Sequence, residues 1–178
     1  RGLDGKILAV EYARVNNVPF LGICLGMQMA VIEYARNVKK MRYANSTEIS
    51  EKCKDPVIDL MISQKEIINK GGTMRLGAWD CKIKKNTKSY KSYKKKLISE
   101  RHRHRYEFNN SYSDRIFDDK FIVAGSNPDT KLVEIVENID HPWFVGVQFH
   151  PEYKSSVYNP HPIFVNFVKA SLKKYLNK

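Results

Sequence analysis

The stretch FLGICLGMQMA, residues 20–30, places one cysteine between two glycines at the end of an apolar run. VPFLGI, residues 18–23, is typical of a short buried strand, and LGMQMAVIEYAR, residues 25–36, is rich in helix formers. Cys24 therefore lies in a sharp turn between a predicted strand and a predicted helix. The apolar spacing over residues 3–16 predicts another helix before them. Helix, strand, turn and helix in succession indicate an α/β layer fold.

The rest of the chain is dominated by predicted strands and ends in a predicted helix, residues 161–178. The strands are predicted within PVIDLM (56–61), GTMRLGAWDCKI (72–83), RHRHRYEF (101–108), FIVAGS (121–126), KLVEIVE (131–137) and WFVGVQF (143–149). No repeat and no linker divides the chain. Because it begins inside a predicted helix and without Met, we expect residues 1–178 to be one domain, truncated at its N-terminus, of a longer protein.

The composition is that of a globular domain, since 42% of the 178 residues are hydrophobic. No apolar run approaches the roughly 20 residues that a membrane span needs, and the N-terminus has no signal-peptide pattern. Cys24, Cys53 and Cys81 fit neither a disulfide framework nor a zinc-site spacing. We therefore expect a cytoplasmic protein with no membrane partner and no metal.

The positive charge is concentrated in one segment. The formal net charge is +12, but KIKKNTKSYKSYKKK, residues 82–96, contains eight lysines and no acidic residue. Such a segment is typical of a solvated, mobile loop, and we favour that interpretation over a phosphate-binding patch. Tyr90 and Tyr93 could stack on bases, but two tyrosines in a lysine tract are weak support for nucleic-acid binding.

The G-x-C-x-G pattern is the cysteine version of the nucleophile elbow, in which the nucleophile sits at a strand-to-helix turn. Gly22 and Gly26 are expected because side chains there would collide with neighbouring backbone. The helix N-terminus would stabilise a Cys24 thiolate, and the Leu25 N–H could hold the oxyanion of a tetrahedral intermediate. The alternative is that Cys24 is a small, packed hydrophobe, since free cysteine is often buried.

A cysteine nucleophile needs a base and a group that orients the base. VQFHPEYKS, residues 147–155, follows the last predicted strand. In extended chain residues i and i+2 point the same way, so His150 and Glu152 are predicted to lie side by side. His150 could accept the thiol proton, and Glu152 could fix its tautomer. H-P-E alone is a short motif, but both motifs follow predicted strands, at the edge where open α/β sheets bind ligands.

Several motifs together carry a resemblance to a known family: PFLGICLGMQMAVIEYARN, ANSTE, GGTMRLG, ERHRHRYE and FVGVQFHPEYKS. From Arg1 to about Ala170 the chain resembles the glutamine amidotransferase domain of CTP synthases, which are class I (triad) glutaminases. The resemblance implies an α/β fold with a mostly parallel central sheet flanked by helices. It also places a second oxyanion donor upstream of Arg1.

The resemblance also implies a reaction. Cys24 would attack the side-chain amide of L-glutamine, with His150 as base and then acid and Glu152 as orienter, forming a γ-glutamyl thioester that water hydrolyses to glutamate. This domain would need no cofactor. The ammonia would pass to a synthetase domain of the same enzyme, a ligase that aminates UTP to CTP with ATP and magnesium and is activated by GTP. The full-length enzyme is expected to be a homo-oligomer, a tetramer.

Further residues take roles through the same resemblance. Gln28 would meet the substrate through its amide, Glu48 would bind the α-ammonium of glutamine, and Arg105 the α-carboxylate. Tyr106 would contribute through its backbone. Thr73 and Arg75, in GGTMRLG, would belong to a lid linked with GTP activation.

RHRHRYE has other interpretations. His102 and His104 could bind a metal, although no third ligand has a useful spacing. Its arginines could instead bind phosphate, or they could have a structural role at an interface with another domain, Arg101 and Arg103 in particular. At the level of the whole chain, two alternatives are the glutaminase of a GMP synthase, disfavoured by GGTMRLG and RHRHRYE, and a basic RNA-binding module. Because the basic segment is typical of a solvated loop, we favour the glutaminase and expect no nucleic-acid partner.

Overall fold

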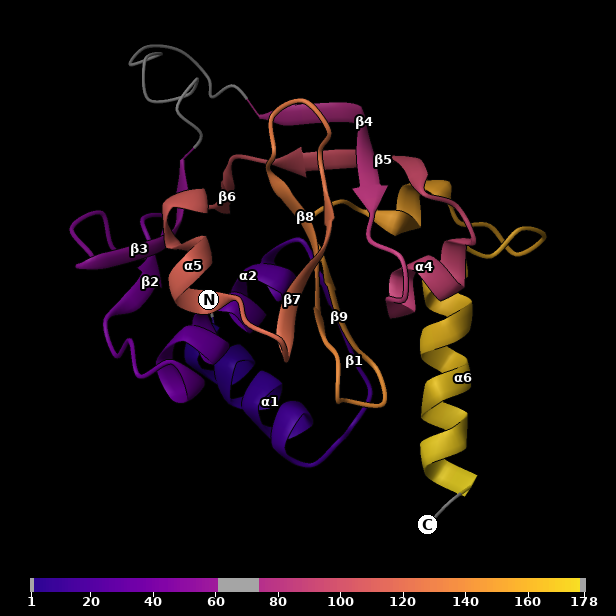
Figure 1. The fold of residues 1–178 in the computed structure, drawn as a ribbon, viewed down its shortest axis with the longest axis horizontal. Coiled ribbons are helices and arrows are strands. Elements are labelled where there is room, and N and C mark those ends of the chain that lie inside the picture. The colour runs from indigo at the N-terminus through magenta and orange to yellow at the C-terminus, as the bar shows by residue number, and fades with distance from the viewer. Residues whose placement is uncertain (1, 61–73, 177–178) are drawn as a thin grey trace.

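Helices cover both faces of a central sheet (Figure 1). The computed structural model describes residues 2–60 and 74–176. The α-helices are α1 Leu3–Val15, α2 Leu25–Glu33, α4 Lys88–Tyr93, α5 Ser113–Ile116 and α6 Pro162–Leu176. A π-helical turn, η1 Tyr34–Val38, continues α2, and two 3-10 turns are η2 Asn110–Tyr112 and η3 Pro151–Lys154. The predicted helices at 3–16, 25–36 and the C-terminus are therefore confirmed.

The strands form two sheets. They are β1 Phe20–Ile23, β2 Ala44–Ser46, β3 Asp55–Leu60, β4 Arg75–Ile83, β5 Leu97–His104, β6 Tyr106–Phe108, β7 Phe121–Ser126, β8 Val133–Asn138 and β9 Phe144–Val147. One sheet has the order β1-β9-β8-β7-β4-β5, and the other has the order β2-β3-β6. RHRHRYEF, predicted as one strand, breaks at Arg105, so that β5 belongs to one sheet and β6 to the other.

The central sheet is mixed, and the expectation of a mostly parallel sheet is wrong. Among the described residues, only β1 and β9 pair in parallel within it, while β9-β8, β8-β7, β7-β4 and β4-β5 are antiparallel. The physical reason is the length of the connections: few residues separate β7 from β8 and β8 from β9, whereas a parallel crossover needs a dozen or more. The α/β class itself is confirmed.

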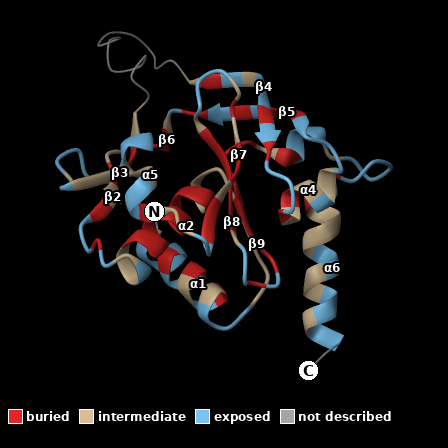
Figure 2. Ribbon diagram, in the orientation of Figure 1, coloured by how far each residue is buried: buried red, intermediate tan, exposed pale blue. Residues whose placement is uncertain are grey.

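Two apolar clusters hold the layers together. The helices α1 and α2 bury Ile7, Val10 and Met27 with Phe121 and Phe144 on one side of the sheet. On the other side, α4 and α6 pack partly buried side chains, among them Tyr93, Phe167 and Ala170, against Ile135 and Val147. Figure 2 shows that burial is concentrated in α2 and the central strands, whereas the outer part of α6 is exposed.

Residues 82–96 are not the mobile loop that their lysine content predicts. Their centre is the helix α4, which Thr87 caps by accepting a hydrogen bond from the Tyr90 N–H at 3.1 Å. The buried Glu137 carboxylate of β8 accepts the N–H groups of Lys88 and Ser89, both at 2.7 Å. A carboxylate at a helix N-terminus stabilises the helix. The composition of residues 82–96 could not predict this contact, because Glu137 lies far away in the sequence.

Among the described residues, no helix is both long enough and apolar enough to cross a membrane. This finding agrees with the absence of any long apolar run in the sequence.

Replacing Thr87 with Ala should loosen α4. Loss of an N-cap hydroxyl costs about 1 kcal/mol, so the amides of Lys91 and Lys94, which donate to the Thr87 and Tyr90 carbonyls, should exchange with solvent about fivefold faster. Hydrogen exchange followed by NMR measures this, and Lys85→Ala, at an exposed neighbouring position, should change neither amide. Rapid exchange of both amides already in the unmodified chain would mean that the segment is a mobile loop.

Candidate active site

Cys24 occupies a strained turn between β1 and α2. It is the N-cap residue of α2, with φ 51° and ψ −104°, a conformation that residues other than glycine rarely adopt and that is typical of functional sites. The Cys24 N–H donates to the Val147 carbonyl at 2.8 Å, which ties the turn to β9. Cys24 is partly exposed, whereas Cys81 is buried, so Cys24 is not a closed core hydrophobe.

The two glycines of the elbow are not equivalent. A Cβ on Gly22 would lie 2.6 Å from the Gly26 backbone carbon and 2.9 Å from the Met27 nitrogen, and neither backbone atom can move aside cheaply. A Cβ on Gly26 would meet nothing within 4 Å outside the backbone of its own helix. The predicted collision is therefore confirmed for Gly22 and wrong for Gly26, because Gly26 faces open space.

His150 and Glu152 are in contact, as predicted, but not because the chain is extended. His150 precedes the 3-10 turn η3, and its Nδ1 lies 2.5 Å from Glu152 Oε1 across that turn. The His150 N–H donates to the Arg101 carbonyl at 2.8 Å, and Lys154 Nζ donates to the Ser99 carbonyl, so β5 supports the turn. His150 Nε2 is buried and has no hydrogen-bond partner among the described residues.

The parallel register of β1 and β9 brings these motifs together. Ile23 pairs with Val147, so the elbow and the H-P-E turn leave the same edge of the sheet. Beside the elbow is a cavity of about 400 Å³, a size typical of small-molecule sites. Its lining includes Cys24, Leu25, Gln28, Glu48, Arg105 and Tyr106, all of which the sequence predicts for this site, together with Met74, Arg103 and His104. We call this cavity the elbow pocket.

The elbow pocket contains both signs of charge. Glu48 follows β2, and Arg105 occupies the break between β5 and β6, where the chain passes from the central sheet to the sheet that contains β2. Gln28 is only 3% exposed, and its Nε2 donates to the Tyr106 carbonyl at 2.9 Å and to Gln148 Oε1 at 3.2 Å. The amide nitrogen of Gln28 is thus bonded within the protein, and a contact between this amide and substrate stays a prediction.

Thr73 lies outside the described residues. Arg75 begins β4 and is 3% exposed, with Nη1 3.2 Å from Glu107 and Nη2 2.7 Å from Glu134. Its guanidinium is therefore committed to two buried carboxylates rather than offered to a ligand. A lid contact by Arg75 would require these hydrogen bonds to open.

Gln148 is a site residue that the sequence reasoning missed. Its side chain is fully buried, and its Nε2 donates to Cys24 Sγ at 3.6 Å while its Oε1 accepts from Gln28. The available signal was its spacing, because Gln148 precedes His150 by two positions in V-Q-F-H. Met74, Arg103 and His104 were also missed as lining residues, although Arg103 and His104 directly precede the predicted Arg105.

The Leu25 N–H at the helix N-terminus lowers the pKa of the Cys24 thiol, as expected, but burial outweighs this effect. Burial raises its pKa to about 11, and the nearby carboxylates of Glu48 and Glu152 raise it further. The Leu25 N–H and the Gln148 amide lower the pKa of Cys24, but they do not offset burial. A partly buried thiol with a raised pKa needs a base before it can act as a nucleophile.

The family model described as glutamine amidotransferase class-I matches residues 1–170. The chain belongs to the class I glutamine amidotransferases. Within this family it is 62% identical to the CTP synthase of Flavobacterium johnsoniae over 172 residues, which is 97% of this chain and 32% of that protein. It is 58% identical to the CTP synthase of Clostridium kluyveri over 172 residues, again 97% of this chain and 32% of that protein. The chain thus spans about a third of the length of these curated relatives.

A solved structure of a CTP synthase domain has the same fold as this chain. The glutaminase domain of the Trypanosoma brucei CTP synthase, solved with bound acivicin, superposes with a TM-score of 0.90 at 39% identity and covers 97% of this chain and 67% of that one. The resemblance to CTP synthase glutaminase domains is therefore confirmed. CTP synthase relatives at these identities also favour that assignment over the glutaminase of a GMP synthase.

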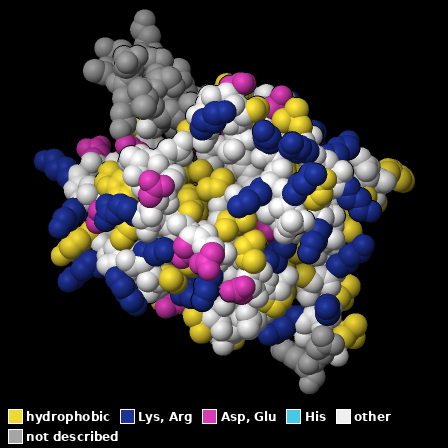
Figure 3. Space-filling view, in the orientation of Figure 1, with side chains coloured by type: hydrophobic (Ala, Val, Ile, Leu, Met, Phe, Trp, Pro, Cys, Tyr) yellow, Lys and Arg dark blue, Asp and Glu magenta, His cyan; other side chains and the backbone are white. Residues whose placement is uncertain are grey.

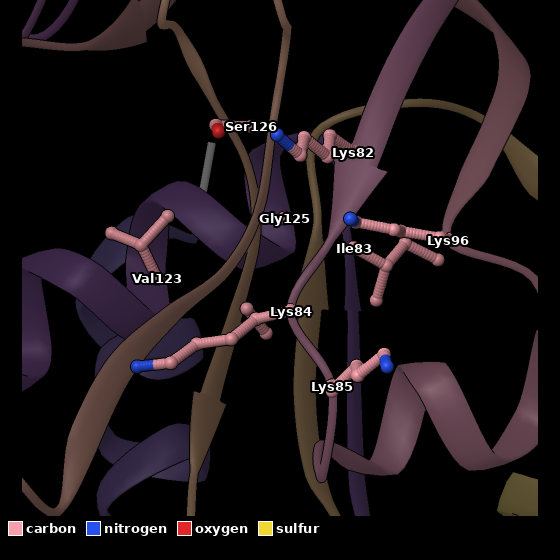
Figure 4. Close-up of a pocket in the computed structure, with 9 residues that line it drawn as sticks. Lys82, Ile83, Lys84, Lys85, Lys96, Val123, Gly125 and Ser126 are labelled. Atoms are coloured by element: carbon pink, nitrogen blue, oxygen red, sulfur yellow. The ribbon is translucent and has the colours of Figure 1, made fainter.

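A second cavity, of about 540 Å³, lies between the ends of β4 and β7 and is bordered by Lys82, Lys84, Lys85 and Lys96 (Figure 4). The side chains of Lys84 and Lys85 extend to opposite sides, so the ammonium groups do not converge on one point. Figure 3 shows lysine and arginine side chains distributed over the visible face, with acidic groups between them. A nucleic-acid site gains no support from this arrangement.

Gly22→Ala should destabilise the fold and Gly26→Ala should not. Forcing a methyl group into the packed turn at Gly22 costs about 1–3 kcal/mol. At Gly26, alanine finds open space and has a higher helix propensity, so the free energy of unfolding should rise or stay within about 0.5 kcal/mol. Urea unfolding of both variants measures the difference. Equal destabilisation would contradict the asymmetry of the elbow.

Alkylation of Cys24 by iodoacetamide should depend steeply on pH. Since only the thiolate reacts, the rate should rise about tenfold per pH unit between about pH 7 and about pH 10. Gln148→Met removes the donor to the sulfur and should slow the reaction of Cys24, while Cys53, measured in the same digest, should be unaffected. If the Cys24 rate already reaches its plateau by about pH 8 and rises no further at higher pH, the resting thiol is already ionised.

Proposed function

We propose that the chain hydrolyses L-glutamine to glutamate and ammonia through a γ-glutamyl thioester on Cys24. The observation that carries this proposal is the elbow pocket, where a thiol at a strained turn shares one small cavity with an acidic and a basic side chain. Membership of the class I glutamine amidotransferases supports the reaction class.

The two charges of the elbow pocket suit the ends of a free amino acid. The Glu48 carboxylate would bind the α-ammonium group of glutamine, and the planar Arg105 guanidinium would bind the α-carboxylate with two parallel hydrogen bonds. Gln28 holds the Tyr106 carbonyl in the pocket wall, so that backbone groups at Tyr106 can contact the substrate. These assignments place the side-chain amide of glutamine toward Cys24.

His150 is suited to act as the base. Its Nδ1 contacts Glu152 Oε1, and because a carboxylate only accepts, Nδ1 carries the proton and the free Nε2 carries the lone pair. Proton transfer from Cys24 Sγ to this Nε2 would generate the thiolate only when it is needed. Glu152 would then stabilise the imidazolium, as the carboxylate does in a serine triad.

The proposed steps balance without a cofactor. The Cys24 sulfur attacks the amide carbon of glutamine, and the oxyanion accepts the Leu25 N–H while His150 returns the proton to the leaving nitrogen as ammonia departs. Water, deprotonated by His150, then attacks the thioester carbon. The carbon–sulfur bond breaks, glutamate is released, and the proton returns to Cys24.

The relatives extend the proposal to a longer enzyme. A chain of their length would combine this glutaminase with a synthetase domain that uses the ammonia to aminate UTP to CTP with ATP, magnesium and GTP as activator. A homotetramer in the cytoplasm is the proposed setting of that enzyme. In it, Cys24→Ala should remove glutamine-dependent synthesis and leave ammonia-dependent synthesis intact.

The deciding experiment is exposure of the chain to a glutamine-shaped electrophile, a chloroketone analogue of glutamine, followed by intact mass and peptide mapping. We expect a single adduct on Cys24 that free glutamine suppresses, and no adduct on Cys53. His150→Ala should slow the labelling of Cys24 and abolish turnover, because nucleophile and base act as a unit. Labelling of Cys24 that glutamine does not suppress would contradict the proposed substrate.

A further inference from the structure

A buried polar cluster lies beneath the elbow pocket, and the proposed chemistry does not use it. Its members come from four strands and are each at most 5% exposed: Arg75 of β4, His102 and His104 of β5, Glu107 of β6 and Glu134 of β8. This cluster contains the two histidines of the RHRHRYE motif. Buried groups of this kind are stable only when each donor faces an acceptor, so the positions of their protons can be worked out from the contacts.

The direction of the hydrogen bonds can be worked out from the Tyr106 carbonyl, which is an acceptor. His104 Nδ1 lies 3.2 Å from this oxygen, which also accepts from Gln28 Nε2 at 2.9 Å. A carbonyl oxygen can only accept, so His104 Nδ1 carries a proton. Burial lowers the pKa of His104 to about 3, so its ring is neutral and Nε2 is an acceptor.

The next hydrogen bond has the same direction. His102 Nδ1 lies 2.9 Å from His104 Nε2, and since the latter accepts, His102 Nδ1 donates. Burial lowers the pKa of His102 to about 2, so His102 is neutral as well and its Nε2 carries a lone pair. That nitrogen faces Glu134 Oε2 at 3.4 Å, and among the described residues neither atom has a hydrogen-bond partner.

Two acceptors facing each other in a buried site require a proton between them. Burial raises the pKa of both Glu134 and Glu107, and the single positive charge of Arg75 can offset only one of the two carboxylates. The contacts decide which one is protonated. Glu107 faces donors only, with Arg75 Nη1 at 3.2 and 3.4 Å, whereas Glu134 Oε2 faces the lone pair of His102. The proton therefore belongs on Glu134.

We propose that protonated Glu134, His102 and His104 form a chain of hydrogen bonds with one fixed direction, which ends on the Tyr106 carbonyl and fixes it in the wall of the elbow pocket. Glu134, His102 and His104 are thus positioning residues rather than metal ligands or phosphate contacts. Arg75 anchors the far end by donating to Glu134 Oε1 at 2.7 Å. Only the consequence for glutamine rests on the proposed function, whereas the proton positions do not.

This chain makes the pocket wall sensitive to pH. When Glu134 ionises, its carboxylate faces the His102 lone pair and the last hydrogen bond is lost, so the Tyr106 carbonyl loses part of its support. The glutamine KM should therefore rise as the pH is raised through about 7, the pKa of Glu134. The titratable and charged groups around Glu134 and the two rings are Arg75 and Cys81 of β4, His102 and His104 of β5, Glu107 of β6, and His150 after β9.

The proton positions are tested directly by NMR of the histidine rings in the 178-residue chain, at about pH 6. We expect both His102 and His104 to be neutral with the proton on Nδ1. The chain supplies its own controls, because His141 and His161 each accept a backbone N–H at Nδ1 and are therefore expected to carry the proton on Nε2. A proton on Nε2 of either His102 or His104 would overturn the proposed direction, whether or not the chain hydrolyses glutamine.

The role of the chain in positioning is tested by steady-state glutaminase kinetics as a function of pH. Glu134→Gln supplies an amide N–H to His102 and a carbonyl to Arg75 at every pH. At low pH its glutamine KM should be close to that of the unmodified chain, and this KM should not rise when the pH is raised. His102→Phe breaks the chain and should raise KM about tenfold with little change in kcat. Glu137→Gln, which also removes a buried carboxylate from β8, should leave KM and its pH dependence unchanged.

Two results would overturn the positioning role: a KM of Glu134→Gln that rises with pH as in the unmodified chain, or an unchanged KM in His102→Phe. Absence of glutamine hydrolysis in every variant, including the unmodified chain, would instead contradict the proposed function. In that case the ring tautomers still decide whether the chain of hydrogen bonds exists.

Discussion

The close approach of β1 to α2 at Gly22 is the constraint on which the candidate site depends. Because no side chain fits between Gly22 and the backbone of Gly26 and Met27, the strand can turn into the helix within one residue. That residue, Cys24, takes a strained conformation and is tied to β9 through the Val147 carbonyl. The same parallel pairing of β1 and β9 brings the H-P-E turn to the edge of the sheet where the elbow lies.

The strand β5 is the second support. One end of it holds the His150 turn through the Arg101 carbonyl, and its other end leads to the break at Arg105 that forms the wall of the elbow pocket. Glu100 of β5 accepts hydrogen bonds from Tyr93 and His161. Tyr93 of α4 therefore links the lysine-rich segment to β5.

The site combines a resting thiol with a buried, internally bonded polar cluster. Burial keeps Cys24 neutral, so reactivity depends on proton transfer to His150 rather than on the helix N-terminus alone. Beneath the pocket, charges are likewise minimised: two neutral imidazoles and a protonated carboxyl leave one ion pair, between Arg75 and Glu107. Neutral groups cost less to bury than charged ones, which explains how so many polar side chains fit in this core.

The sequence by itself determined the helices α1, α2 and α6, most strands, the elbow and the contact between His150 and Glu152, because those features depend on periodicity, glycine spacing and neighbours along the chain. It did not determine that the central sheet is mixed, that part of residues 82–96 forms the helix α4, or that Gln148 contacts Cys24. Glu137 caps α4 from β8, and Gln148 meets Cys24 from β9, so only the folded chain brings these partners together. The thiol pKa is likewise a property of burial, which no local pattern around Cys24 contains.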